Sequence, residues 1–155
     1  MKLLNLSLLF LTFFYSSITF AQPIANVFVF SEKGNERNEK CNVSYESAVA
    51  AVKASLRYNR VPVVATDTSP FSLYINLNNH EFSSRACSIA INLHVYFYAP
   101  VNVPYTNKKP FLKTMLCERT TAGVLDKINQ QSSINTELKS MVEECLASIE
   151  NTLSK

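Results

Sequence analysis

Glycine, histidine and aspartate are scarce in this chain of 155 residues, which has two glycines and two histidines. With Gly34 and Gly123 alone, no glycine-rich phosphate loop can form, and neither Gly-x-Ser-x-Gly nor His-Glu-x-x-His occurs. The only aspartates, Asp67 and Asp126, fall in segments that are expected to turn, where Asp is a common turn former. These absences exclude the common motifs of nucleotide binding, serine hydrolysis and zinc proteolysis. The sequence predicts a protein that is not an enzyme and that takes no cofactor and no metal.

Long apolar runs are absent after the N-terminus. One lysine, an apolar run from Leu3 to Phe14, and Thr-Phe-Ala before Gln22 together describe a secretory signal peptide over residues 1–21. The run is too short for a transmembrane helix, which needs about 20 apolar residues. No cysteine adjoins the expected cleavage point, so no lipid anchor is expected. We therefore expect a single periplasmic or secreted domain over residues 22–155, without stable membrane insertion.

Neither sign of charge dominates the chain. Lys and Arg number 15 against 12 Asp and Glu, a formal net charge of +3. A nucleic-acid-binding domain would need a concentrated basic stripe. The trio Lys53, Arg57 and Arg60 has instead the spacing of the solvent-facing side of one helix. The sequence therefore predicts no nucleic-acid partner.

Four cysteines lie after the expected signal peptide, and an even number in an exported chain predicts two disulfides. None are spaced as Cys-x-x-Cys, and two histidines add no closed tetrahedral metal set. Short connections keep successive elements adjacent, which places Cys41 near Cys87 at one end of the sheet and Cys117 beside Cys145 on the last helix. Of the three possible connectivities we expect Cys41–Cys87 and Cys117–Cys145.

Hydrophobic periodicity predicts the element order β-α-β-β-β-α. This order is typical of an α+β two-layer sandwich, in which an antiparallel meander carries two helices on one face. The expected elements are a strand over 25–30, a helix capped by Ser44 and reaching about residue 60, strands over 71–77, 87–98 and 111–121, and a helix from about Ser133.

One face of the expected meander carries Asn, His and Tyr rather than charged side chains. An open antiparallel sheet face needs polar residues merely to contact water. Tyrosine, however, presents a large apolar body with a polar tip and is enriched at recognition surfaces. Thr114 and Glu118 are expected to border this face. We expect it to bind a protein partner or a second copy of the chain through Tyr74, Asn76, Asn92, His94, Tyr96 and Tyr98.

Two other interpretations stay open. The protein can be a periplasmic immunity or inhibitor protein, although the acidic residues that would mimic a substrate are scarce. It can also be a small secreted hydrolase that uses His94. A cysteine nucleophile for that histidine is not expected, because a cysteine in a disulfide has no free thiolate.

Overall fold

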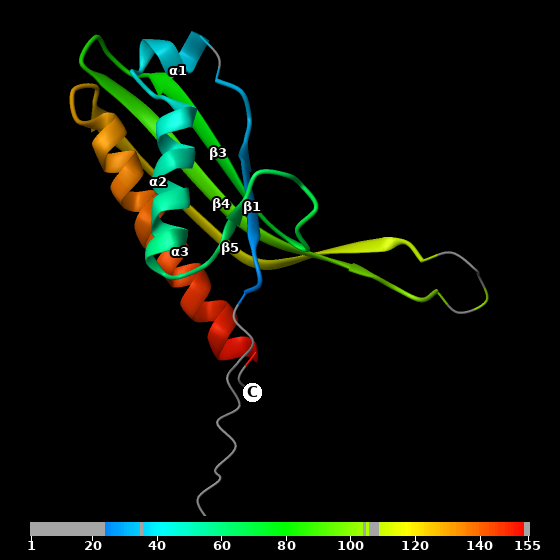
Figure 1. The fold of residues 1–155 in the computed structure, drawn as a ribbon. Coiled ribbons are helices and arrows are strands. Elements are labelled where there is room, and N and C mark those ends of the chain that lie inside the picture. The colour runs from blue at the N-terminus through cyan, green and yellow to red at the C-terminus, as the bar shows by residue number, and fades with distance from the viewer. Residues whose placement is uncertain (1–23, 35, 104, 106–108, 154–155) are drawn as a thin grey trace, which may run out of the picture.

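Two long helices cover one face of a five-stranded sheet in the computed structural model, which describes residues 24–153 except 35, 104 and 106–108 (Figure 1). The expected signal peptide lies outside the described residues. No helix in the described part is long and apolar enough to cross a membrane. The elements are β1 (Val27–Ser31), α1 (Glu36–Lys40), α2 (Tyr45–Tyr58), β2 (Val63–Val64), β3 (Phe71–Glu81), β4 (Ala86–Pro100), β5 (Phe111–Asp126) and α3 (Gln130–Leu153).

The sheet has the strand order β2-β1-β3-β4-β5. The α+β class is confirmed, and β3, β4 and β5 form the expected antiparallel meander. The sheet as a whole is mixed rather than purely antiparallel, because β1 runs parallel to β3 and β2 runs parallel to β1. The reason is the crossover helix α2, which returns the chain to the sheet in its original direction. Strand β5 lies at the outer edge.

Helix α2 begins as its sequence predicts. The Ser44 hydroxyl accepts a hydrogen bond from the backbone N–H of Ser47 at 3.1 Å, the contact that defines an N-cap. Ala48, Val52 and Leu56 then point into the core at helical spacing. Helix α3 begins three residues earlier than expected, at Gln130. The short helix α1 lies in a charged segment where no element is expected.

The core lies between the helices and one face of the meander. On β4, alternate residues are buried, while the residues between them are only half-buried on the opposite face. Helices α2 and α3 pack on the buried side and against each other. The buried side chains of β4 are Cys87, Ile89, Ile91, Leu93 and Val95.

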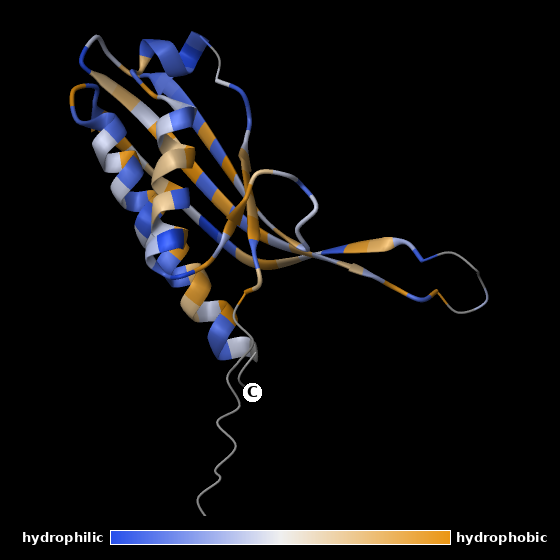
Figure 2. Cartoon of the chain, in the orientation of Figure 1, coloured by the Kyte–Doolittle hydropathy of each residue, from blue (hydrophilic) through white to orange (hydrophobic). Residues whose placement is uncertain are grey.

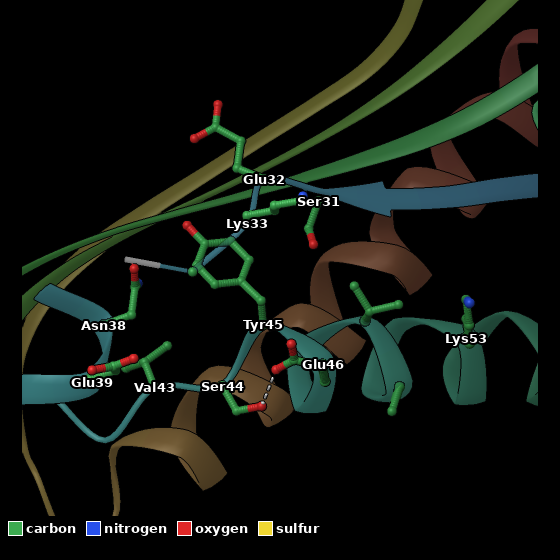
Figure 3. A pocket seen from close by; sticks show the side chains of 13 residues that line it. Ser31, Glu32, Lys33, Asn38, Glu39, Val43, Ser44, Tyr45, Glu46 and Lys53 are labelled. Atoms are coloured by element: carbon green, nitrogen blue, oxygen red, sulfur yellow. Dashed lines mark hydrogen bonds between the residues drawn. The ribbon is translucent and has the colours of Figure 1, made fainter. Parts of the chain in front are cut away.

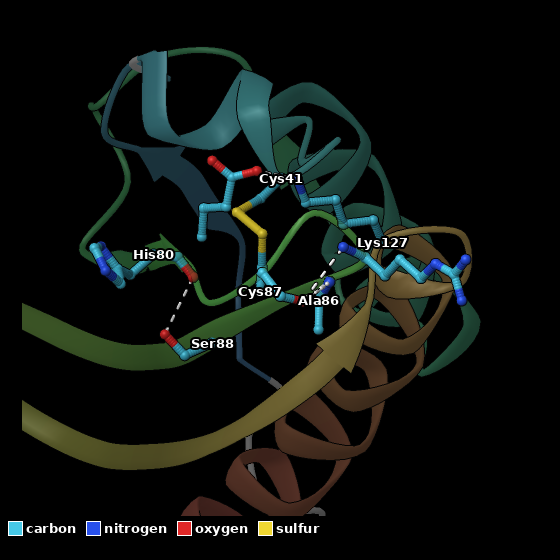
Figure 4. Close-up of a disulfide and its surroundings, with 9 residues drawn as sticks. Cys41, His80, Ala86, Cys87, Ser88 and Lys127 are labelled. Atoms are coloured by element: carbon cyan, nitrogen blue, oxygen red, sulfur yellow. Dashed lines mark hydrogen bonds and ion pairs between the residues drawn. A yellow bond between two sulfur atoms is a disulfide. The ribbon is translucent and has the colours of Figure 1, made fainter.

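Both disulfides join the pairs expected from the sequence. Cys41 and Cys87 have Cα atoms 5.9 Å apart, and Cys117 and Cys145 have Cα atoms 5.6 Å apart. The first bond fixes the chain before α2 to the start of β4 (Figure 4). The second ties the last helix to the edge strand. Disulfides persist in oxidising compartments, so this arrangement is compatible with a location outside the cytoplasm.

A β-bulge in β5 changes which residues share a face. Tyr96 pairs with Met115 and Val95 pairs with Cys117, so Leu116 is an extra residue without an opposite partner. Glu118 pairs with His94 and lies on the open face, as expected. Thr114 pairs with Phe97 and lies on the helix side, which corrects the expectation that it borders the open face.

Candidate binding face

The sheet face opposite the helices carries all six residues that the sequence singles out. Tyr74 and Asn76 come from β3, and Asn92, His94, Tyr96 and Tyr98 come from β4. Tyr74 lies directly opposite His94, and Asn76 lies directly opposite Asn92. All six side chains are half-buried. They are held by their neighbours while keeping part of their surface open to a partner.

Five rings form a continuous row across this face, which we call the aromatic row. Phe28 and Phe30 on β1 stack at 5.7 Å between ring centroids, and Phe30 contacts Tyr74 at 5.1 Å. Tyr74 contacts the imidazole of His94 at 5.9 Å, and His94 meets Tyr96 edge-on at 5.8 Å. These separations lie in the range favoured by aromatic pairs. The row crosses three strands without a break.

His94 is held at both ring nitrogens. Its Nε2 lies 3.3 Å from the Glu118 carboxylate, and its Nδ1 lies 2.8 Å from the Tyr96 hydroxyl. Because an ionised carboxylate only accepts, Nε2 carries a proton, and in the neutral ring Nδ1 accepts from the Tyr96 hydroxyl. Catalysis by His94 would need one nitrogen to be released first. The arrangement orients the imidazole within the aromatic row.

Tyr74 is fixed in a similar way. Its hydroxyl donates to the Glu32 carboxylate at 2.5 Å and accepts from the Asn76 amide at 3.1 Å. Burial raises the pKa of the Tyr74 phenol, and the hydrogen bond to Glu32 raises it further. The phenol therefore stays protonated and keeps donating at neutral pH.

Tyr98 lies apart from the row, toward the far end of β4. It lines a hollow of about 790 Å³ together with Phe28, Phe30 and Phe111. Ser72 lies at the same hollow, where its hydroxyl is buried and has no hydrogen-bond partner among the described residues. Beside this hollow the Lys113 ammonium stands 3.6 Å above the centre of the Tyr96 ring, a cation–π contact.

Phe28, Phe30, Glu32 and Lys113 are the residues of this face that sequence reasoning missed. The signal for the two phenylalanines was present, because Val27 and Val29 alternate with them and are buried in the structure. What the pattern lacked was the neighbour of β1. Only the parallel pairing with β3 places Phe30 opposite Tyr74.

A second hollow, of about 810 Å³, lies on the helix side of β1 (Figure 3). Its walls carry Glu32, Lys33, Glu46 and Lys53, so charges of both signs are mixed there. The Tyr45 phenol projects into the same region, and burial raises its pKa. The mixture of charges selects no class of ligand, and we assign no function to this hollow.

The Tyr45 hydroxyl substitutes for a missing strand. Strand β1 stops pairing at Ser31, opposite Ile75, which leaves the next part of the β3 edge without a strand beside it. There the Tyr45 hydroxyl donates to the carbonyl of Leu77 at 2.6 Å and accepts from the Leu77 N–H at 3.3 Å. One side chain thus satisfies both buried backbone groups of Leu77.

We expect Tyr45→Phe to lower the free energy of unfolding by about 1–3 kcal/mol, because it leaves the Leu77 N–H and carbonyl buried without a partner. Urea unfolding followed by circular dichroism measures the change. Tyr58→Phe removes the same hydroxyl from a ring that is 84% exposed, and it should leave the unfolding midpoint in place. Equal midpoints for the two variants would contradict the role given to Tyr45.

Comparison with known proteins assigns no family: no family model matches the sequence, and no curated protein matches it. Three solved structures resemble the chain. A dodecamer of a PelC variant from Paraburkholderia phytofirmans has a TM-score of 0.43 and 8% identity, over 83% of this chain and 87% of that one. The hypothetical protein CT253 from Chlamydia trachomatis has a TM-score of 0.42 and 10% identity, over 83% and 98%. A minor lipoprotein from Acinetobacter baumannii has a TM-score of 0.27 and 11% identity, over 84% and 93%.

Likenesses this distant carry no argument about function. Fold and site together define a class only: a small α+β domain with two disulfides and an aromatic row on its open sheet face.

Proposed function

We propose that this protein is exported and works by binding a protein partner through the open sheet face. The observation that carries the proposal is the aromatic row, from Phe28 to Tyr96, on a face that neither long helix covers. A solvated sheet face needs polar atoms, but it does not need large rings in mutual contact. The row offers apolar area of the kind that dominates binding energy at protein interfaces.

The rings are ordered before any partner arrives. Glu32 holds Tyr74, and Glu118 and Tyr96 hold His94. A partner would therefore restrict few rotamers that are still free, and this lowers the entropic cost of association. Tyrosine and phenylalanine add to this advantage, since each has only two side-chain torsions to fix.

Charge on this face is placed at the margin of the rings. Glu32 lies beyond the Tyr74 hydroxyl, Glu118 lies on the edge strand, and Lys113 stands over Tyr96. An apolar centre with charged groups around it matches the anatomy of protein interfaces, where charge is depleted at the core. The marginal charges would favour one orientation of the partner over others.

The test is a quantitative pull-down of the tagged, exported protein from its native envelope or medium, without reducing agent. Truncating an aromatic anchor typically costs at least about 2 kcal/mol, or about 30-fold in affinity. We expect Tyr96→Ala with Tyr98→Ala to lose a partner that the wild type retains. The proposal fails if the double variant retains the same partners as the wild type.

The matched control is Tyr58→Ala, which removes an exposed tyrosine from the end of α2. It should retain the partner. Because Tyr96 contacts His94, the unfolding midpoint of the double variant is measured in parallel. A folded double variant that loses the partner attributes the loss to the face itself.

A further inference from the structure

Strands β4 and β5 continue past the rest of the sheet as a two-stranded arm that projects from the body (Figure 1). Apolar colour is concentrated toward the outer part of this arm (Figure 2). Phe111 is 73% exposed and Leu112 is 57% exposed, although side chains of this size are usually buried. We call the exposed apolar residues the arm tip: Val101, Val103, Tyr105, Phe111 and Leu112.

The arm tip is apolar on both of its faces. Phe111 pairs with Pro100, and Leu112 pairs with Ala99. Because successive strand residues point to opposite sides, the two large side chains project in opposite directions. A flat protein surface would cover only one of them. A medium that surrounds the arm would cover both.

Charge near the arm tip has one sign. The sequence contains no Asp or Glu between Glu81 and Glu118. Lys109 and Lys113 flank Phe111 and Leu112 among the described residues. Two copies meeting tip to tip would bring these ammonium groups together with no carboxylate between them. The charge therefore disfavours tip-to-tip self-association and favours an anionic partner.

We propose that the arm tip inserts peripherally into a membrane surface that carries anionic lipid. A lipid interface surrounds an inserted element, so it would cover Phe111 and Leu112 at once. Tyr and Phe favour the depth of the headgroups, and lysines are attracted to anionic lipid. The backbone of the arm pairs within itself, as in the Val101 N–H bond to the Pro110 carbonyl at 2.9 Å, so shallow burial strands few polar groups.

This inference goes beyond the proposed function, because the arm tip and the aromatic row are different surfaces. Each can hold while the other fails. The arm would keep the protein at a membrane, while the open face would stay available to a protein partner.

The lack of tryptophan in the sequence makes a direct test possible, since Phe111→Trp introduces the only indole. Vesicles of phosphatidylcholine are compared with vesicles that also carry about 30 mol % phosphatidylglycerol. We expect the anionic vesicles alone to shift the emission to shorter wavelength and to allow quenching by brominated lipid. Tyr58→Trp, on the body, should respond to neither.

Vesicle sedimentation gives the affinities. Lys109→Gln should weaken partition into anionic vesicles about fivefold, the usual effect of one charge near such a surface. Phe111→Ser with Leu112→Ser should abolish binding, whereas Ile128→Ser should not, although Ile128 is 88% exposed after the other end of β5. The proposal is overturned if the wild type does not bind anionic vesicles, or if the Phe111/Leu112 variant binds them equally. A Phe111→Trp shift that depends on protein concentration without vesicles would overturn it in favour of a second copy.

Discussion

Replacing all four cysteines by alanine is expected to remove about 4–8 kcal/mol from the free energy of unfolding, because each disulfide typically contributes about 2–4 kcal/mol. Single domains of this kind have only about 5–15 kcal/mol in total. The Cys41–Cys87 pair should contribute the larger share. It joins residues 46 apart in sequence, against 28 for Cys117–Cys145, and the longer loop restricts the unfolded chain more.

Local structure supports the same expectation. Cys41 and Cys87 are fully buried, so alanine at both positions also removes packed sulfur from the core. Urea unfolding of the wild type, the two double variants and the fourfold variant measures the losses. Chemically reduced wild type should resemble the fourfold variant. An unchanged midpoint in the fourfold variant would show that the bonds do not constrain the fold.

Leu93→Ala should cost about 2–5 kcal/mol, the range observed when a large buried side chain is truncated and its surroundings cannot collapse. Leu93 has no exposed surface and lies in β4 between Ile75 on β3 and Arg119 on β5. Its side chain faces the helices. Hydrogen-bonded strands on both sides prevent the backbone from moving in to fill the cavity.

The neighbouring position on the same strand supplies the control. Asn92 faces the open side and accepts a hydrogen bond from the Thr120 hydroxyl at 3.0 Å. Because that contact is exposed, Asn92→Ala should cost less than about 1 kcal/mol. Similar losses at residues 92 and 93 would contradict a sheet that has one buried and one open face.

The meander and its two faces could be predicted because the signal is local. Strict alternation in β3 and β4 identifies which residues share a face, and the short turn between the strands sets their register. The disulfide pairs followed from the same short connections. The place of β1 could not be predicted in this way, because alternation identifies the faces of a strand but not its neighbour.

The bulge in β5 accounts for the other error. Met115 and Leu116 are two large apolar residues in succession, which weakens the alternation of this strand. The pattern alone does not say which of them is the extra residue, so Thr114 was assigned to the wrong face. Six open-face residues were placed correctly because β3 and β4 pair without any register shift from Phe71 to Glu81. Whether those six bind a partner remains a prediction.

The parallel position of β1 also bears on when the aromatic row comes into existence. The β3–β4 hairpin needs only a short loop closure, since Glu81 pairs with Cys87 across one turn. Pairing β1 with β3 brings Val27 to Phe71 across the whole of α2 and β2, a far more non-local contact. Phe28 and Phe30 join the row only through that pairing. A chain with only its local structure formed therefore displays an incomplete face, and the complete row belongs to the fully folded protein.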